Sequence, residues 1–448
     1  MLVSLCDGTA FANEPSKGGD QTPYTDGNEH LGVIGCYGST CHSRQEATGV
    51  IVRQNEILTW QDETSSTGTH LRAYKVLKSE RSRTITQRLG LGNAWEEDSC
   101  LGCHADNIPA SLRGNNFQIE DGVGCESCHG GATNWLTQHY AVGANHDKNV
   151  ALGLYPLEDA QTSVKICLSC HLGSAAENQF VTHRFMAAGH PRISFELDLF
   201  IALQRHHDED VDYTNRKKVQ TGAQRWAIGQ AESLIRLLTL FENPSLNSDG
   251  MFPELVFFDC LACHRPISDD PDWRPNVRPN PGRPAAPGLV KFNDANMLML
   301  LGTTLQIAPE LAPQLSSQIK EFHASLAGGP ITTAKASDAL KATTRTLIKR
   351  IRQTDFTAEQ TLAILDNILT ETLSKRYTDY VAAEQAIMAV DTLLSSMIAA
   401  KQAVPADVLS MREQINIGYD AVEDPNAYQQ DTLSTALIAI QTRLGTLK

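Results

Sequence analysis

Five short units, in each of which a pair of cysteines is followed at once by a histidine, constrain this chain more than any other feature. Four have the spacing Cys-x-x-Cys-His: Cys100-Cys103-His104, Cys125-Cys128-His129, Cys167-Cys170-His171 and Cys260-Cys263-His264. Chance predicts about 0.008 such units in a chain of this composition. Two cysteines three residues apart on a helical turn point the same way, so both thiols can bond to the vinyl groups of one porphyrin. The adjacent histidine then reaches the iron, and the pattern indicates covalently bound haem c.

The remaining unit, which comes first along the chain, is longer, with four residues between Cys36 and Cys41 before His42. Numbered in chain order it is the first unit, and the other four are the second to the fifth. The Cys-His pair that sets iron ligation is unchanged, and Gly38 lets the two extra residues bulge between the thioethers. Ten of the eleven cysteines therefore belong to haem units, and the expected cofactors are five haems c. The expected attachment cysteines are Cys36, Cys41, Cys100, Cys103, Cys125, Cys128, Cys167, Cys170, Cys260 and Cys263. The expected proximal iron ligands are His42, His104, His129, His171 and His264.

Zinc is the structural alternative for these cysteines. Cys103 and Cys125 are separated by 21 residues, which is close to the spacing of a zinc ribbon. A zinc site does not require a histidine directly after every second cysteine, yet all five units have one. The haem interpretation is therefore preferred.

A low-spin haem needs a second axial ligand, and nine histidines lie outside the five units. The candidate distal ligands are His30, His70, His139, His183 and His190, although a lone histidine is more often a hydrogen-bonded residue than a ligand. Seven residues of helix span about 10.5 Å, so His183 and His190 cannot share an iron but can serve two neighbouring haems. His206 and His207 precede three acidic residues, which favours a solvated loop there. His146 and His323 are expected to be non-ligands.

Four segments carry a resemblance to a known family: IEDGVGCESCHGGATNWLTQH, CLSCHLG, MAAGHPRISFEL and FFDCLACHRP. With them the chain resembles the multihaem cytochrome c-552/c-554 family over roughly residues 30–290. The resemblance implies an exported, mostly helical protein that relays electrons between periplasmic redox partners. It favours His139, His183 and His190 as distal ligands, and it implies that one iron can lack a second protein ligand. The four residues between Cys36 and Cys41 depart from the usual two.

The expected fold class is mainly α, with little β. We divide the chain into a signal-peptide remnant at 1–12, a pentahaem domain at 13–265, a Pro-rich linker at 266–290 and a C-terminal helical domain at 291–448. In the haem part, residues 48–59 are the best strand or hairpin candidate. Helices are predicted there at 70–90, 180–188, 195–206 and 221–242.

The C-terminal part has no cysteine and one histidine, and its apolar residues recur at helical spacing. Thr357 and Gln360 fit a capping box at the start of one helix. An up-and-down bundle packed on the haem part is the simplest interpretation. Helices are predicted near 294–307, 311–326, 332–353, 358–375, 378–402, 405–416 and 427–446.

The N-terminal segment indicates export. Ala10-Phe11-Ala12 matches a signal-peptidase site, and we expect the mature protein to begin near Asn13. Cys6 is expected to be a leftover signal residue, with lipid attachment as the alternative. No later stretch approaches 18 consecutive apolar residues, so we expect no membrane span and a periplasmic or secreted location.

The chain is acidic, with a formal net charge of -14 before any haem propionate is counted. That balance argues against nucleic acid as a partner, because phosphates need lysine and arginine. It suits docking to a redox partner with a basic patch, such as a membrane quinol-linked protein or another cytochrome. The alternative is that the acidity only maintains solubility. The oligomeric state is left open.

Three functions fit these features. The first is an electron carrier, in which ligands and surroundings only set the potentials of the haems. The second is a reductase or oxidase of a small nitrogen or sulfur species, which needs one iron with an open position and a nearby proton donor. The third is a subunit of a larger redox complex, with the C-terminal helices as its docking surface; the alternative for these helices is a domain that only buries haem faces.

Overall fold

The computed structural model describes residues 22–45, 54–174, 179–205, 207, 213, 217, 219–247, 254–264, 282–285, 289–374 and 380–445. Three of the sequence predictions fall wholly or mainly outside these residues. They are the signal-peptide remnant with Cys6, the position of His206, and most of the Pro-rich linker. The described chain is mainly helical, which confirms the predicted fold class.

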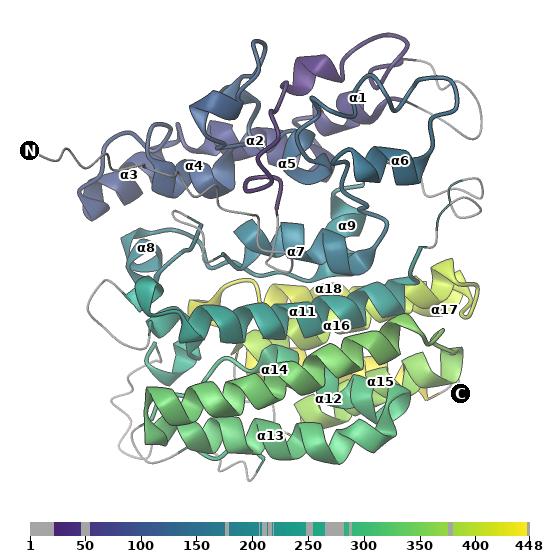
Figure 1. Ribbon diagram of the computed structural model, residues 1–448. Coiled ribbons are helices and arrows are strands. Elements are labelled where there is room, and N and C mark those ends of the chain that lie inside the picture. The colour runs from purple at the N-terminus through teal and green to yellow at the C-terminus, as the bar shows by residue number, and fades with distance from the viewer. Residues whose placement is uncertain are drawn as a thin grey trace, which may run out of the picture.

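The first half of the molecule consists of short helices joined by long connections, seen in the upper part of Figure 1. Its helices are α1 (Glu56–Trp60), α2 (Thr69–Val76), α3 (Glu80–Leu89), α4 (Asp98–His104), α5 (Glu126–His129), α6 (His146–Ala151), α7 (Ala160–His171), α8 (His183–Ala188) and α9 (Leu197–Leu203). The single helix predicted at 70–90 is two helices, because Ser79 caps a new one by accepting a hydrogen bond from the Ser82 amide.

Longer helices form the second half. They are α11 (Gly222–Glu242), α12 (Ala295–Ile307), α13 (Ala312–Ser325), α14 (Pro330–Arg352), α15 (Ala358–Leu373), α16 (Tyr380–Ala399), α17 (Pro405–Leu409), α18 (Arg412–Ala421) and α19 (Gln430–Leu444). The segment predicted at 405–416 divides into α17 and α18. The capping box of Thr357 and Gln360 is present at the start of α15, so that prediction is confirmed.

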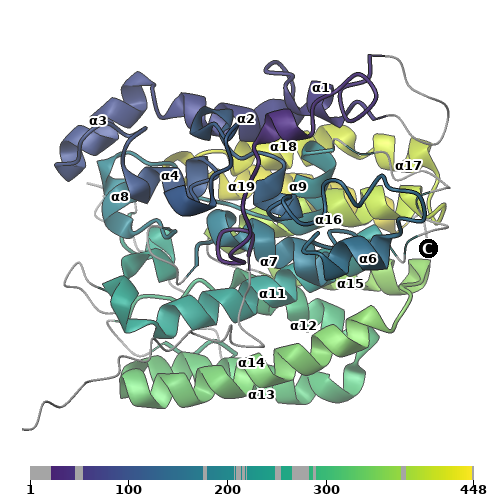
Figure 2. The same cartoon turned by 45° about the horizontal axis from the view of Figure 1, so that its top comes forward.

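One hydrophobic core extends from Ala160 in α7 to Leu444 in α19, so residues before and after the Pro-rich linker contribute to it. Helix α11 lies between α7 and α14 in both views (Figures 1 and 2) and also packs on α9, α12 and α16. A Cβ atom at Gly229 would lie 2.7 Å from the Leu197 Cβ, so glycine allows α9 and α11 to approach closely. The haem-bearing and C-terminal parts therefore share a packed interface.

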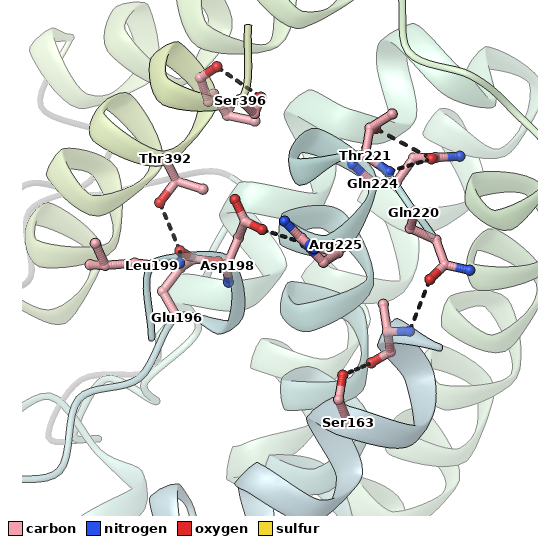
Figure 3. Close-up of polar contacts among 12 residues, drawn as sticks. Ser163, Glu196, Asp198, Leu199, Gln220, Thr221, Gln224, Arg225, Thr392 and Ser396 are labelled. Carbon is pink, nitrogen blue, oxygen red and sulfur yellow. Dashed lines mark hydrogen bonds and ion pairs between the residues drawn. The ribbon is translucent and has the colours of Figure 1, made fainter. Parts of the chain in front are cut away.

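Polar contacts reinforce this interface where α9, α11 and α16 meet (Figure 3). The carboxylate of Glu196 accepts hydrogen bonds from the Leu199 amide and the Thr392 hydroxyl, both at 2.8 Å. Arg225 of α11 donates to Asp198 of α9 at 2.6 Å. Buried polar groups are tolerated when they are paired in this way, so the contacts fix α9 against the two long helices.

The strand candidate at 48–59 is wrong where the structure describes it. Glu56–Trp60 forms α1, and Ile57 and Trp60 are buried together on one face of that turn. These two side chains are three positions apart in the sequence, which suits a helical turn rather than a strand. The described residues contain no strand, only isolated bridges between His30 and Arg113 and between Phe258 and Phe292.

By length and composition, α16 is the one helix among the described residues that could cross a membrane, with a mean hydropathy of 1.3 over its most apolar window. Of that window, 78% is buried inside the protein. Helix α16 packs against α9, α11, α12, α15 and α18. Burial on this scale is typical of the core helix of a folded domain.

Candidate functional site

The cysteine–histidine units lie at the ends of short helical segments. The second, third and fourth units are at the C-terminal ends of α4, α5 and α7, and the fifth forms a 3-10 turn at Cys260–Ala262. In the first unit the Cys41 amide donates to the Gly38 carbonyl at 2.9 Å, which closes the longer loop between the two cysteines. None of the ten unit cysteines forms a disulfide in the described part of the chain, so each pair is available for thioether attachment.

Each unit histidine faces one histidine from elsewhere in the chain. The distances between ring centroids are 6.2 Å for His42–His139, 6.3 Å for His70–His171, 6.3 Å for His104–His190, 5.9 Å for His129–His207 and 6.0 Å for His183–His264. The fold thus brings together five pairs, and no histidine is shared between two of them.

The spacing of these pairs fits an iron between two imidazoles. A metal–imidazole bond of about 2 Å on each side, and about 1.1 Å from each nitrogen to its ring centre, requires centroids roughly 6.3 Å apart. All five pairs lie within about half an ångström of that value. A direct hydrogen bond between two rings would bring the centroids closer than this. The residues present therefore fit a metal with two axial histidines.

Hydrogen bonds at Nδ1 orient several of these rings. The Nδ1–H of His104 donates to the Ala73 carbonyl at 2.8 Å, and that of His190 donates to the Pro191 carbonyl at 2.7 Å. His139 donates in the same way to the Leu136 carbonyl. With Nδ1 occupied, Nε2 is the nitrogen that is left for a metal, as is usual for histidine ligands held by an outer shell of acceptors.

Burial keeps several of the paired histidines neutral. It lowers the pKa of His171 to about 4 and also lowers the pKa values of His104 and His190. A neutral imidazole has the free lone pair that a metal needs. These three rings are therefore in the protonation state of a ligand at neutral pH.

The sequence prediction for His30 is not supported by its position. Its buried ring has both nitrogens engaged, Nδ1 with Asp106 at 2.7 Å and Nε2 with the Pro23 carbonyl at 3.3 Å. Although burial lowers the pKa of His30, the hydrogen bond to Asp106 raises it overall. A ring that donates from both nitrogens has no lone pair for iron, so in this structure His30 is a hydrogen-bonding residue rather than a partner of a unit histidine.

His207, and not His30, is the fifth histidine that faces a unit histidine. The sequence favoured a solvated loop for it because acidic residues follow, but its ring faces His129 of the third unit. The residues that precede His207 form no recognisable ligand motif. The signal that could have identified it is the number of units, because five unit histidines need five partner histidines. Of the expected non-ligands, His146 pairs with Glu158, and His323 pairs with Asp294 at 2.9 Å.

His183 and His190 face different units, as the distance argument predicted. His183 faces His264 of the fifth unit, and His190 faces His104 of the second. Helix α8 separates the two rings, and Gly189 ends it in the left-handed conformation at φ 119°. One short helix therefore supplies partners to two units.

Glu126, which sequence reasoning did not single out, fixes the first unit against the third. Its carboxylate accepts hydrogen bonds from the backbone amides of Leu31 at 2.9 Å, Gly32 at 2.7 Å and Ala132 at 2.8 Å. Burial raises the pKa of Glu126 despite these donors. It is the first residue between the cysteines of the third unit, and it orders the chain that leads into Cys36.

Cysteines of different units lie side by side. The side chains of Cys36 and Cys125 lie within interaction distance of each other, and so do those of Cys103 and Cys170. The Cys170 thiol also lies 3.7 Å from the Gly102 carbonyl of the second unit. The first unit therefore adjoins the third, and the second adjoins the fourth.

An apolar cavity lies beside the fifth unit. Phe180, Leu237, Val256 and Phe257 line it together with Cys260. Val381 of α16 and Asn293, both from the C-terminal part, complete its wall. Arg192 also lines the cavity; it is ion-paired with Glu384 of α16 and lies 5.1 Å above the Tyr380 ring. An apolar wall with one cation suits a porphyrin, whose faces are apolar and whose propionates are anionic.

The attachment units and their facing histidines define the class of the protein, a c-type cytochrome that takes part in electron transfer. Residues 38–130 match the family model for cytochrome c554 and c-prime, so the chain is cytochrome c-554-like over that segment. The match includes His42 and the second and third units, and it begins after Cys36. No curated protein and no solved structure matches the chain.

Proposed function

We propose that this protein is a pentahaem electron-transfer cytochrome of the periplasm in which two histidines ligate every iron. The proposed axial pairs are His42 with His139, His104 with His190, His129 with His207, His171 with His70, and His264 with His183. Bound haem supplies a reversible one-electron couple at each of these pairs. The observation that carries the proposal is the uniform spacing of the five pairs, 5.9–6.3 Å between ring centroids.

Two further features support a relay rather than catalysis. With both axial positions taken by histidine, the protein leaves no iron open to a substrate, which the reductase or oxidase alternative requires. The adjoining cysteines of the first and third units, and of the second and fourth, support short distances between cofactors. The chain's own residues then hold the irons in place and set their potentials through ligation, burial and charge.

In this proposal the C-terminal helices also help to form a haem site. Val381 and Asn293 line the cavity beside Cys260, and Arg192 is tied to α16 through Glu384. We propose that the bundle forms one wall of the fifth haem site. Redox partner proteins remain the proposed partners, and export is proposed from the N-terminal segment and the family resemblance.

The test is a count of haems combined with the spin state of each. The purified exported protein should contain five haems per chain by pyridine haemochrome assay and by mass, and N-terminal sequencing should start near Asn13. Its oxidised spectrum should be entirely low-spin and unchanged by cyanide or nitric oxide. A high-spin haem that binds either ligand would favour the enzyme, and fewer than five haems would contradict the proposed set.

The ring orientations give a second readout. The imidazole planes are 17° apart in the His42–His139 pair but 85° and 89° apart in the His104–His190 and His129–His207 pairs. Perpendicular axial imidazoles leave two iron d orbitals nearly degenerate, which produces a strongly anisotropic ferric signal. We expect electron paramagnetic resonance to show two such haems and at least one ordinary low-spin signal.

A further inference from the structure

One carboxylate lies between histidines of two different units. Glu56 is the first residue of α1. Its Oε2 is 3.0 Å from Nδ1 of His42, and its Oε1 is 3.4 Å from Nδ1 of His207. A carboxylate can only accept, so both imidazoles donate their Nδ1–H to Glu56.

These two histidines belong to different axial pairs. His42 faces His139, whereas His207 faces His129. We propose that Glu56 is a positioning residue shared by the haems of the first and third units, and that its charge holds both at lower reduction potentials than a neutral residue would. This inference rests on the proposed function, because it requires iron at both pairs.

The place of Glu56 is fixed from two sides. The Ile57 amide donates to the His42 carbonyl at 2.9 Å, which ties the start of α1 to the first unit. The Trp60 indole donates to the Val123 carbonyl at 3.2 Å, two residues before Cys125 of the third unit. Ile57 and Trp60 are 2% and 7% exposed, so the helix cannot shift without losing buried apolar contacts.

The same small cluster contacts the attachment cysteines themselves. Ile57, Trp60 and Val33 form it, and Cys36 and Cys125 pack against it. Helix α1 therefore contacts the first and third units through one attachment cysteine of each. The carboxylate at its start reaches a ligand of each.

The chemical consequence follows from the donated hydrogen bonds. A carboxylate that accepts Nδ1–H makes the imidazole a stronger electron donor, which stabilises ferric iron and lowers the reduction potential. His104 and His190 donate instead to neutral backbone carbonyls. The side chain of Glu56 is 19% exposed, so water screens its charge only partly.

The experiment compares three variants of the exported holoprotein by spectroelectrochemical titration. Glu56→Gln keeps the shape and removes the charge, and we expect two of the five haems to shift to higher potential while three stay in place. Glu56→Asp restores the charge and should return both towards the starting values. Glu158→Gln is the matched control, because Glu158 pairs with His146, which faces no unit histidine in the part of the chain that the structure describes. This variant should shift the potential of no haem.

Three results would overturn the inference: no shift in Glu56→Gln, a shift of a single haem, or an equal shift of all five. The haem count and spin state should be measured on the same samples. These two measurements distinguish a failure of the role of Glu56 from a failure of the proposed function. With five low-spin haems in every variant and no paired shift, only the role of Glu56 is lost. Fewer than five haems, or a high-spin iron, in the unmodified protein would refute both.

Discussion

The parts of the molecule before and after Ala160 are stabilised in different ways. In the described residues before it, buried apolar side chains form small clusters around Tyr74, Val33 and Ile85, none with more than five buried members. After it, a single core includes Trp226, Leu234 and Leu393, all fully buried. A segment of this length with so little apolar burial needs another source of stability.

The comparison teaches where the cofactors matter for folding. Three of the five proposed axial pairs have their unit histidine before Ala160, in the part with the small clusters, and His70 of that part faces the unit histidine of a fourth pair. In the proposed haem set, two covalent bonds and two iron ligands per haem would cross-link that part. The second part has a conventional helical core and is stable through apolar burial.

Removal of haem should have the largest effect and should fall on the first part. In protein produced without haem attachment, we expect residues 22–159 to lose fixed structure while the helices from α12 to α19 keep theirs. The reason is that only the second part buries a large apolar core on its own. Hydrogen exchange read by mass spectrometry would measure protection segment by segment, with the holoprotein as the control. Equal protection of both parts without haem would break the comparison.

A cavity in the shared core should have the next largest effect and should fall on the second part. Leu234 of α11 is fully buried, and Leu234→Ala should reduce the free energy of unfolding by about 3–4 kcal/mol. The haem absorption spectrum of the native protein should not change. Ile438 is 54% exposed on α19, so Ile438→Ala is the control and should have little effect on a denaturant titration. A spectral change in Leu234→Ala would show that the two parts are not separable.

The sequence predicted best what depends on local chemistry. Covalent haem attachment depends on residues that are close in sequence, so the sequence pattern alone identifies the five units. Helical periodicity located α11 and α12 to within one residue at each end. Thr357 and Gln360 identified a helix start because a capping box needs only residues three apart.

What the sequence could not show depends on contacts made across the fold. His70 faces His171 and His139 faces His42, pairings that no local spacing encodes. His207 was missed because the acidic residues that follow it in the sequence favoured a solvated loop. Packing also places α7, α9 and α11 in one core with the C-terminal helices, which composition alone does not encode.

Glu196 should make stability depend on pH within the second part, where α9 meets α16. Burial raises the pKa of Glu196 to about 7 from its ordinary value of 4.5, and the nearby Asp198 adds to the increase. The folded state thus prefers the neutral carboxyl. Its contribution is fully present below about pH 4.5 and is lost as pH rises through 7, a decrease of about 3 kcal/mol.

Glu196→Gln should remove that dependence. Melting temperatures measured between pH 4.5 and pH 8 should fall with rising pH in the unmodified protein and stay flatter in the variant. Asp431 at the start of α19 lies outside the shared interface, so Asp431→Asn serves as the control and should leave the pH profile unchanged. A steeper fall in Glu196→Gln would contradict the assigned protonation state.

Two helix caps of the same kind should have the smallest effects, and they differ in how near they lie to the haem-bearing helix α7. Thr357 caps α15 within the C-terminal helices, and Thr221 caps α11, each in a complete capping box. Replacing either by alanine should cost about 1 kcal/mol in the free energy of unfolding, and serine should restore most of it. The destabilisation caused by Thr221→Ala should also reach α7. The adjacent Gln220 accepts a hydrogen bond from the Ala160 amide at the start of α7, and α7 ends in the fourth unit. We therefore expect Thr221→Ala to speed hydrogen exchange in α7 and Thr357→Ala to leave α7 unchanged; an equal effect of both on α7 would mean that the core transmits strain across its whole length.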